Sequence, residues 1–302
     1  MGAILTKQAT IVADAGPASG LGHLSRAGAA AVALRCHGFD VRALVLGSDE
    51  PIVRDGIRWT PVDQAPRAIK GVVVVDSYLL DADAVAAIRG AGPLLAFADG
   101  ARRPPAADIL VGHGLDDPCA LDGLVFACLR PMFWGLEPRA PEPQVGRVLV
   151  SVGASTVAGG AALAAAVAAA LPDCDVRLVA GPYAEETPAG QVTIVRAPED
   201  LLGELLAADL VVSAAGQTML EAACTGTPCV ALAIADNQRF QLAALEQAGA
   251  VVAATAQTAP ATVARLAADA AGRAALAERS RALVDGFGAL RLAWRLLAWA
   301  PR

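Results

Sequence analysis

Short, uninterrupted apolar runs recur along this chain, and most are bounded by glycine, proline or aspartate. They occupy residues 11–13, 43–46, 72–75, 94–97 and 109–111 of the first half, and 148–150, 210–212 and 229–232 of the second. Further strands are expected at residues 176–179 and 192–195, each of which contains one polar residue. Continuous apolar runs are typical of strands covered on both faces. Helical stretches lie between them, for example residues 24–37 and 82–89. The alternation predicts an α/β fold with doubly wound parallel sheets.

The pattern stops at residues 136–144, where three prolines occur within six residues. This composition is typical of a stiff connector, and the same alternation restarts beyond it. We therefore expect two Rossmann-like domains, residues 1–140 and 141–302. A terminal helix at residues 290–298, with Trp294 in it and Trp299 after it, is expected to pack at the seam between the domains. Strand ends from both domains are expected to face one interdomain cleft.

The composition excludes some classes of partner. The 302 residues are 55% hydrophobic and carry a formal net charge of -6, so no basic field is available for nucleic acid or an anionic membrane. The longest apolar run, residues 157–171, is shorter than the ~20 residues of a membrane span and predicts a buried helix. The first apolar stretch is short, and no signal peptide is expected. We predict a cytoplasmic protein without a membrane span, either a monomer or a homodimer.

The cysteines are interpreted as buried thiols. The six show no C-x-x-C spacing, and most lie inside apolar segments; they are Cys36, Cys119, Cys128, Cys174, Cys224 and Cys229. Neither a disulfide framework nor a metal site is indicated. The sequence predicts no metal and no cofactor.

The strand at residues 210–212 runs into a turn of small residues and then into a helix. N–H groups at the start of a helix lack intrahelical partners and lie at the positive end of its dipole, so the turn is suited to a phosphate. Glu221, one turn into the helix, is placed to reach a sugar hydroxyl beside the phosphates. A glycine that serves packing alone is the alternative. The predicted nucleotide-binding residues here are Ser213, Ala215, Gly216, Gln217, Thr218 and Glu221.

A glycine-rich loop at residues 16–23 follows the first strand. Gly20 and Gly22 allow a close backbone approach and are predicted on the nucleotide side. His23 then stands at a helix N-terminus, where the dipole disfavours the imidazolium and keeps a neutral base available near pH 7. Only His37 and His113 offer other imidazoles. The alternative for His23 is a capping or packing role.

Polar residues at other strand ends are candidate sugar ligands. Asp76 either caps the next helix or orients a neighbour, and Tyr78 either hydrogen-bonds a sugar or covers apolar surface. Asp99 is interpreted as a turn residue. Asn237 and Gln238 have donors and acceptors for sugar hydroxyls, although a plain helix cap explains the same residues.

Several short motifs follow one another along the chain. In the first half they are Gly20-Leu21-Gly22-His23 with Arg26, Asp76-Ser77-Tyr78 with Asp81, and residues 129–133. In the second half they are residues 208–210, residues 214–218 with Glu221, Asn237-Gln238, and Asp285-Gly286 with Arg291. Together they resemble the nucleotide-sugar hydrolase of pseudaminic acid biosynthesis and the related spore-coat polysaccharide proteins. These belong to the wider GT-B group, which includes the lipid II-forming N-acetylglucosamine transferase. The resemblance spans nearly the whole chain.

The resemblance implies a GT-B fold that binds a UDP-sugar between its domains, with the diphosphate on the Gly216 loop and Glu221 near the ribose. It further implies that His23 activates water, that Tyr78 and Asn237 position the sugar, and that UDP and a free amino-sugar are released without a metal. Asp76 and Gln238 are assigned to sugar binding.

The chain departs from that family at three places. Residues 152–155 lack the usual acidic side chain, Ala98-Asp99 replaces a paired acidic motif, and a position near His113 is commonly Asn in the family. These departures leave the sugar open. Two further functions also stay open: glycosyl transfer from the same donor to an acceptor, and nucleotide-sugar binding without turnover.

Overall fold

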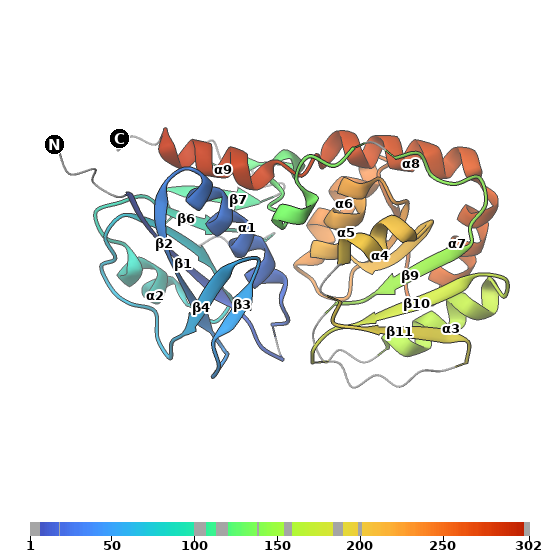
Figure 1. The fold of residues 1–302 in the computed structure, drawn as a ribbon, viewed down its shortest axis with the longest axis horizontal. Helices are drawn as coiled ribbons and strands as arrows, with labels where there is room; N and C mark the ends of the chain where they lie inside the picture. The colour runs from blue at the N-terminus through green and yellow to red at the C-terminus, as the bar shows by residue number, and fades with distance from the viewer. Residues whose placement is uncertain are drawn as a thin grey trace. The chain divides into compact units, whose positions relative to one another are not determined.

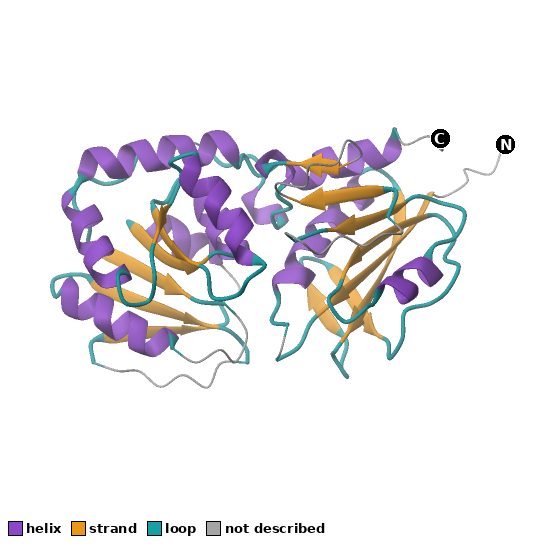
Figure 2. Cartoon of the chain, turned by 180° about the vertical axis from the view of Figure 1, so that it is seen from behind, coloured by secondary structure: helices purple, strands orange, loops and turns teal. Residues whose placement is uncertain are grey.

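The computed structural model describes residues 7–17, 19–99, 107–112, 120–137, 139–153, 159–183, 190–198 and 201–298. The chain divides into two compact units, Met1–Pro131 with Phe287–Arg302 and Met132–Gly286. Each unit is a largely parallel sheet with helices packed against it (Figures 1 and 2). The predicted α/β fold with two doubly wound, Rossmann-like units is confirmed.

In the described part of the N-terminal unit, eight strands pair in the order β3-β4-β2-β1-β5-β6-β7-β8. They are β1 (Lys7–Asp14), β2 (Phe39–Leu46), β3 (Ile52–Arg54), β4 (Ile57–Pro61), β5 (Val72–Asp76), β6 (Leu94–Phe97), β7 (Ile109–Gly112) and β8 (Ala120–Asp122). All pairings are parallel except the β3–β4 hairpin. This hairpin was not predicted from the sequence, although Asp55-Gly56, with φ of 50° and 72°, is a typical hairpin turn.

Helices α1 (Gly22–Cys36), α2 (Ala82–Ile88) and α9 (Gly288–Leu297) and the short helix η1 (Leu124–Phe126) complete this unit. Helix α9 packs against α1 and η1 (Figure 1). Its buried face consists of Ala289, Leu292, Ala293 and Leu296, whereas Trp294 is 62% exposed. The last helix therefore belongs to the N-terminal unit, which differs from the expected domain 141–302. The expectation that Trp294 packs was wrong, and Trp299 lies outside the described residues.

A close backbone contact fixes the start of α9. A Cβ added to Gly288 lies 2.2 Å from the carbonyl oxygen of Ala127, so that only glycine fits there. We expect Gly288→Ala to lower the free energy of unfolding by about 1–3 kcal/mol, because backbone must shift to admit the methyl group. Gly28→Ala in α1 is the control, since its nearest contact is an ordinary 3.6 Å to Trp59. Urea unfolding of both variants measures the difference; equal stabilities contradict the prediction.

In the described part of the C-terminal unit, six parallel strands pair in the order β11-β10-β9-β12-β13-β14. They are β9 (Arg147–Ser151), β10 (Asp175–Ala180), β11 (Val192–Arg196), β12 (Leu210–Ala214), β13 (Cys229–Leu232) and β14 (Val252–Ala253). The helices are α3 (Gly160–Ala170), α4 (Leu201–Ala207), α5 (Gln217–Thr225), α6 (Gln238–Gln247), α7 (Ala259–Ala268) and α8 (Ala270–Leu283).

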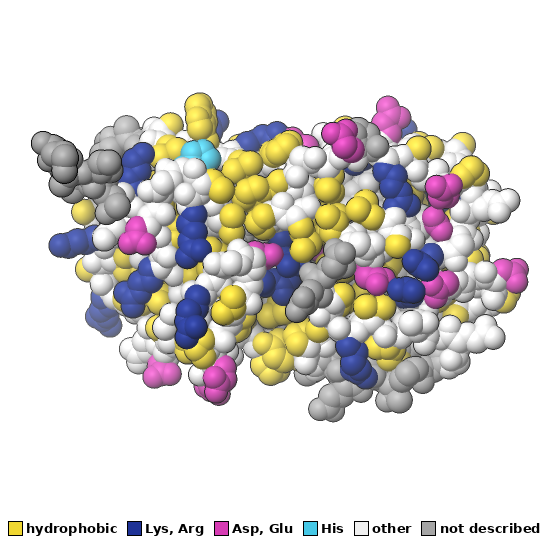
Figure 3. All heavy atoms as spheres, viewed as in Figure 1, with side chains coloured by type: hydrophobic (Ala, Val, Ile, Leu, Met, Phe, Trp, Pro, Cys, Tyr) yellow, Lys and Arg dark blue, Asp and Glu magenta, His cyan; other side chains and the backbone are white. Residues whose placement is uncertain are grey.

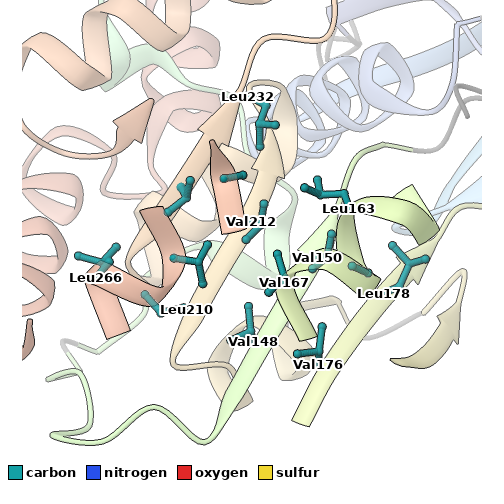
Figure 4. Close-up of a cluster of buried hydrophobic side chains, with 14 of the residues drawn as sticks. Val148, Val150, Leu163, Val167, Val176, Leu178, Leu210, Val212, Leu232 and Leu266 are labelled. Carbon is teal, nitrogen blue, oxygen red and sulfur yellow. The ribbon is translucent and has the colours of Figure 1, made fainter. Parts of the chain in front are cut away.

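The core of this unit is built by aliphatic side chains from β9, β10 and β12 that meet Leu163 and Val167 of α3 and Leu266 of α7 (Figure 4). Only one face of α3 is buried. The predicted buried helix at 157–171 is therefore a surface helix that covers the sheet with one side, and its first residues lie outside the described part of the chain.

The proline-rich connector is held by two arginines of α8. Arg273, whose side chain is fully buried, donates to the carbonyl oxygens of Glu142 and Pro143 at 3.0 and 2.8 Å. Arg281 donates to those of Leu136 and Glu137. These bonds attach the connector to the C-terminal unit. The division between units falls before it, at Pro131, and differs from the expected boundary at residue 140 for this reason.

Surface charges are mixed in sign, and most of the described cysteines are buried. Basic and acidic side chains are interspersed on the face shown in Figure 3. Burial raises the pKa of Cys128, Cys224 and Cys229 to about 12, so these thiols stay protonated at neutral pH. Cys36 is exposed, and Cys119 lies outside the described residues. None of the helices described is both long and apolar enough to cross a membrane.

Candidate functional site

Three carboxylates gather at one edge of the N-terminal sheet. Asp14 ends β1, Asp76 ends β5, and Asp99 lies two residues beyond β6. The strands β1, β5 and β6 are neighbours and run parallel, so their carboxyl ends meet. Asp14 and Asp76 are 0% and 1% exposed. Buried carboxylates that lie this close together are stable only with a positive charge or hydrogen-bond donors beside them.

Arg26, in α1, supplies the positive charge. Its guanidinium donates to both oxygens of Asp76, at 2.7 and 2.8 Å, and to both oxygens of Asp99, at 2.7 and 2.9 Å. The same group lies over the Phe97 ring, 4.7 Å from its centroid. Although burial lowers the pKa of Arg26, the two carboxylates raise it well above its usual value. Burial raises the pKa of Asp99, but Arg26 outweighs it and holds that pKa far below its ordinary range.

Asp76 thus orients a neighbour, which is one of the two structural roles the sequence left open. Both of its oxygens accept hydrogen bonds from Arg26, and its assignment as a sugar ligand stays a prediction. The next helix is capped by Asp81, which accepts from the N–H of Ala84. Asp99, interpreted as a turn residue, is instead a partner of Arg26.

His23 occupies the first turn of α1 and is 9% exposed. Its Nδ1 lies 3.6 Å from Asp14 Oδ2. That oxygen also accepts the N–H groups of Tyr78 and Leu79, at 2.5 and 3.2 Å. The Asp14 carboxylate therefore faces one ring nitrogen, and a proton on Nδ1 leaves Nε2 as the nitrogen that accepts protons.

The pKa of His23 differs from the sequence expectation. Burial lowers it, but Asp76 and Asp14 raise it more, and the net shift is upward from 6.5. The sequence expectation, an imidazolium disfavoured by the helix dipole, has the opposite direction to this net shift. Asp76 and Asp14 raise the pKa because they are negative charges close to a buried imidazole. The pKa of Asp14 is lowered despite burial, mainly by its interaction with His23.

Tyr78 contacts both His23 and Asp99. Its ring meets His23 edge to face with centroids 4.3 Å apart, and its hydroxyl donates to Asp99. The residue is 37% exposed, so one side of the ring stays accessible. Of the predicted residues, the structure therefore brings together His23, Asp76 and Tyr78.

The glycine-rich loop before α1 is closed on itself. Gly16 and Gly20 exchange backbone hydrogen bonds, and a Cβ at Gly16 lies 2.5 Å from the carbonyl oxygen of Gly47. Gly20 has φ +67° and thus satisfies the turn. A Cβ placed on Gly22 meets no atom within 4 Å, so this residue leaves open space beside His23.

The predicted phosphate turn lies between β12 and α5 of the C-terminal unit. Ser213 is fully buried, and its hydroxyl donates to the Ala214 carbonyl. The N–H of Ala215 donates to Leu232, and that of Gly216 donates to Ala214. These three residues serve the turn itself. The first turn of α5, which follows them, has no side-chain cap, and its predicted role in holding a phosphate stays a prediction.

That first turn is accessible at Gly216, Gln217 and Thr218, whereas Glu221 is 2% exposed. Helix α6 packs beside the turn, and Gln241 donates to the carbonyl oxygens of both Ala215 and Gly216, at 3.3 Å each. The turn is thereby held in place by α6. The role predicted for Glu221 at a ribose stays a prediction.

Asn237 is the N-cap residue of α6 but makes no side-chain capping bond. Gln238 begins the helix and accepts the N–H of Ile234 at 2.9 Å. Both lie in the C-terminal unit near the α5 turn, since a Cβ at Gly216 is 3.7 Å from Gln238 Nε2. Their sugar-binding roles stay predictions.

The importance of Asp14, Arg26 and Asp99 was underestimated from the sequence. The available signal was the strand-end position of both aspartates, and the spacing of Arg26, three residues after His23 and so on the same face of α1. Of the three departures from the family, residues 154–155 and His113 lie outside the described residues.

No protein-family model and no curated protein matches this sequence. Solved structures do match. The glycosyltransferase SnogD from Streptomyces nogalater has a TM-score of 0.65 at 18% identity, covering 98% of this chain and 100% of that one. MurG of Acinetobacter baumannii has a TM-score of 0.62 at 16% identity, with 97% and 100% covered. The S. aureus MnaA–UDP co-structure has a TM-score of 0.66 at 11% identity, with 98% and 99% covered. These similarities show the fold, which is GT-B as predicted.

Proposed function

We propose that this protein transfers a glycosyl group from a nucleotide-sugar donor, with UDP-sugars the first donors to test. The observation that supports it most directly is the His23–Asp14 pair, a buried imidazole 3.6 Å from a buried carboxylate, at the strand ends of a GT-B fold. SnogD, of the same fold, is a glycosyltransferase, and MnaA was solved with UDP.

In this proposal the N-terminal unit supplies the base and the C-terminal unit supplies the turn that binds the diphosphate. His23 accepts the proton of an acceptor hydroxyl, and Asp14 stabilises the resulting imidazolium. The acceptor oxygen forms a bond to the anomeric carbon while the bond from that carbon to the β-phosphate oxygen breaks. The leaving diphosphate gains negative charge, and in this proposal N–H groups at the first turn of α5 stabilise it.

Hydrolysis of the same donor is the second candidate. It is favoured by the motif resemblance to the pseudaminic acid pathway hydrolase and requires only that water replace the acceptor, since His23 activates either nucleophile. The products are then UDP and the free sugar. The roles predicted for Tyr78 and Asn237 in holding the sugar are the same in both reactions.

Incubation of the purified protein with a panel of UDP-sugars separates these functions. UDP release is measured with and without a panel of hydroxyl acceptors, and the products are identified by mass spectrometry. A new glycoside supports transfer, whereas UDP and free sugar in equal amounts without acceptor support hydrolysis. UDP binding without any turnover supports a non-catalytic binding protein, and absence of UDP binding contradicts all three.

The Asp14→Asn variant tests the His23–Asp14 pair through pH. Because Asp14 raises the pKa of His23, its loss lowers that pKa, and a neutral imidazole becomes available at lower pH. In the wild type we expect kcat/KM to rise with pH through a value above 6.5. In Asp14→Asn this rise should move to lower pH while the plateau falls. An unchanged midpoint contradicts the assignment of the pH dependence to His23.

A further inference from the structure

A cavity of about 600 Å³ opens in the N-terminal unit beside α2. Residues from three segments line it: the end of β2 with Gly47, four residues between 63 and 67 after β4, and six residues between 79 and 87 before and within α2. Its volume is in the range of small-molecule sites. We propose that it binds a small polyhydroxylated molecule that carries a protonated amine, such as an amino sugar.

The charges that line the cavity favour a cation. Three carboxylates, those of Asp63, Asp81 and Asp83, and one guanidinium, that of Arg67, line the cavity, and all four residues are exposed. One carboxylate oxygen of Asp81 accepts the N–H of Ala84 and so caps α2. In the described part of the chain, the side chains of Asp63, Asp83 and Arg67 have no ion pair or hydrogen bond. Two carboxylates from different segments are thus available to an amine, and Arg67 is available to hydroxyl oxygens.

The remaining wall is apolar, which suits the CH face of a sugar ring. Leu46, Leu79, Leu80, Ala84 and Ala87 form it. Leu79 is 61% exposed and is therefore accessible to a ligand in the cavity. Small alanines on α2 keep the space open. Polar groups at the rim and an apolar wall are the usual composition of a small-molecule site.

The cavity is joined to the His23 cluster by one loop. Tyr78 contacts His23, and Leu79, the next residue, lines the cavity. Both residues donate their N–H groups to Asp14. A ligand that packs on Leu79 therefore contacts the segment that positions Tyr78. The inference is independent of the proposed function, because binding is measured without a donor.

Binding is tested by NMR with methyl-labelled leucine in the full chain. Glucosamine and N-acetylglucosamine are titrated at about pH 6.5, where the free amine is protonated and the acetylated one is neutral. We expect glucosamine to shift the methyl signals of Leu79 and Leu80 and to bind at least about tenfold more tightly, since a charge-assisted bond is lost on acetylation. Equal affinities, or no shift at these leucines, overturn the proposal.

Two pairs of variants locate the site. Asp63→Asn with Asp83→Asn should abolish the preference for glucosamine, whereas Asp40→Asn, exposed at the opposite end of β2, should preserve it. Ala84→Phe should fill the cavity and prevent binding, whereas Ala86→Phe, exposed on the same helix and outside the lining, should not. Glucosamine binding that survives in a folded Ala84→Phe variant overturns the proposed location.

Discussion

Replacing His23 with alanine is expected to lower turnover by about 10²- to 10⁴-fold, the usual contribution of a general base. The imidazole lies opposite Asp14, and no contact with the nucleotide is assigned to it, so UDP binding should be retained. Turnover is followed by UDP release, and binding by calorimetry with UDP alone. His37→Ala is the matched control, because His37 lies at the other end of α1 and its ring is hydrogen-bonded to the Ala33 carbonyl of the same helix.

The opposite result is expected at the phosphate turn. Gly216→Ala has room in the protein, with its Cβ 3.7 Å from Gln238, but it narrows the approach to the first turn of α5. UDP binding should weaken there while His23→Ala leaves it intact. Undiminished turnover in His23→Ala contradicts the assigned base, and equal loss of UDP binding in both variants contradicts the division of roles.

Replacing Arg26 with methionine is expected to cause the largest loss of stability, about 3–5 kcal/mol, as found when one partner of a buried ion pair is removed. The substitution leaves Asp76, 1% exposed, and Asp99 without the guanidinium that engages all four of their oxygens. Urea unfolding followed by the fluorescence of Trp59, which is buried in the same unit, measures the effect.

Two further variants separate charge from packing. Arg26→Met combined with Asp76→Asn and Asp99→Asn should recover part of the loss, because no charge then stays buried without a partner. Arg239→Ala, which breaks an ion pair whose side chains are 71% and 95% exposed, should change stability little. If Arg26→Met is no less stable than Arg239→Ala, the cluster is not a stabilising element.

The strand pattern was legible in the sequence because each strand is covered on both faces and so consists of consecutive apolar residues. This holds for 72–75 in β5 and for 210–212 in β12. The short strands β3, β4, β8 and β14 were missed, since they are only partly buried and have no such run. The start of α1 beside His23 was also predictable, from glycines followed by a helical stretch.

The boundary between units and the place of α9 were not predictable in the same way. A proline-rich segment signals a connector but does not say which unit holds it, and two arginines of α8, more than a hundred residues away, decide that. Likewise, the buried face of α9 is evident from its pattern, but its contact with α1 depends on a backbone approach at Gly288.

The sequence by itself determined most of the strands, their parallel pairing and the candidate base, because these follow from local apolar runs and from residue types at strand ends. Only the tertiary structure decided how His23 is charged. Asp14, Asp76 and Asp99 are far apart in the chain and meet because β1, β5 and β6 are adjacent in the sheet. Electrostatic energy depends on distance in space, so neither the raised pKa of His23 nor the dependence of the cluster on Arg26 is visible before the strands are paired.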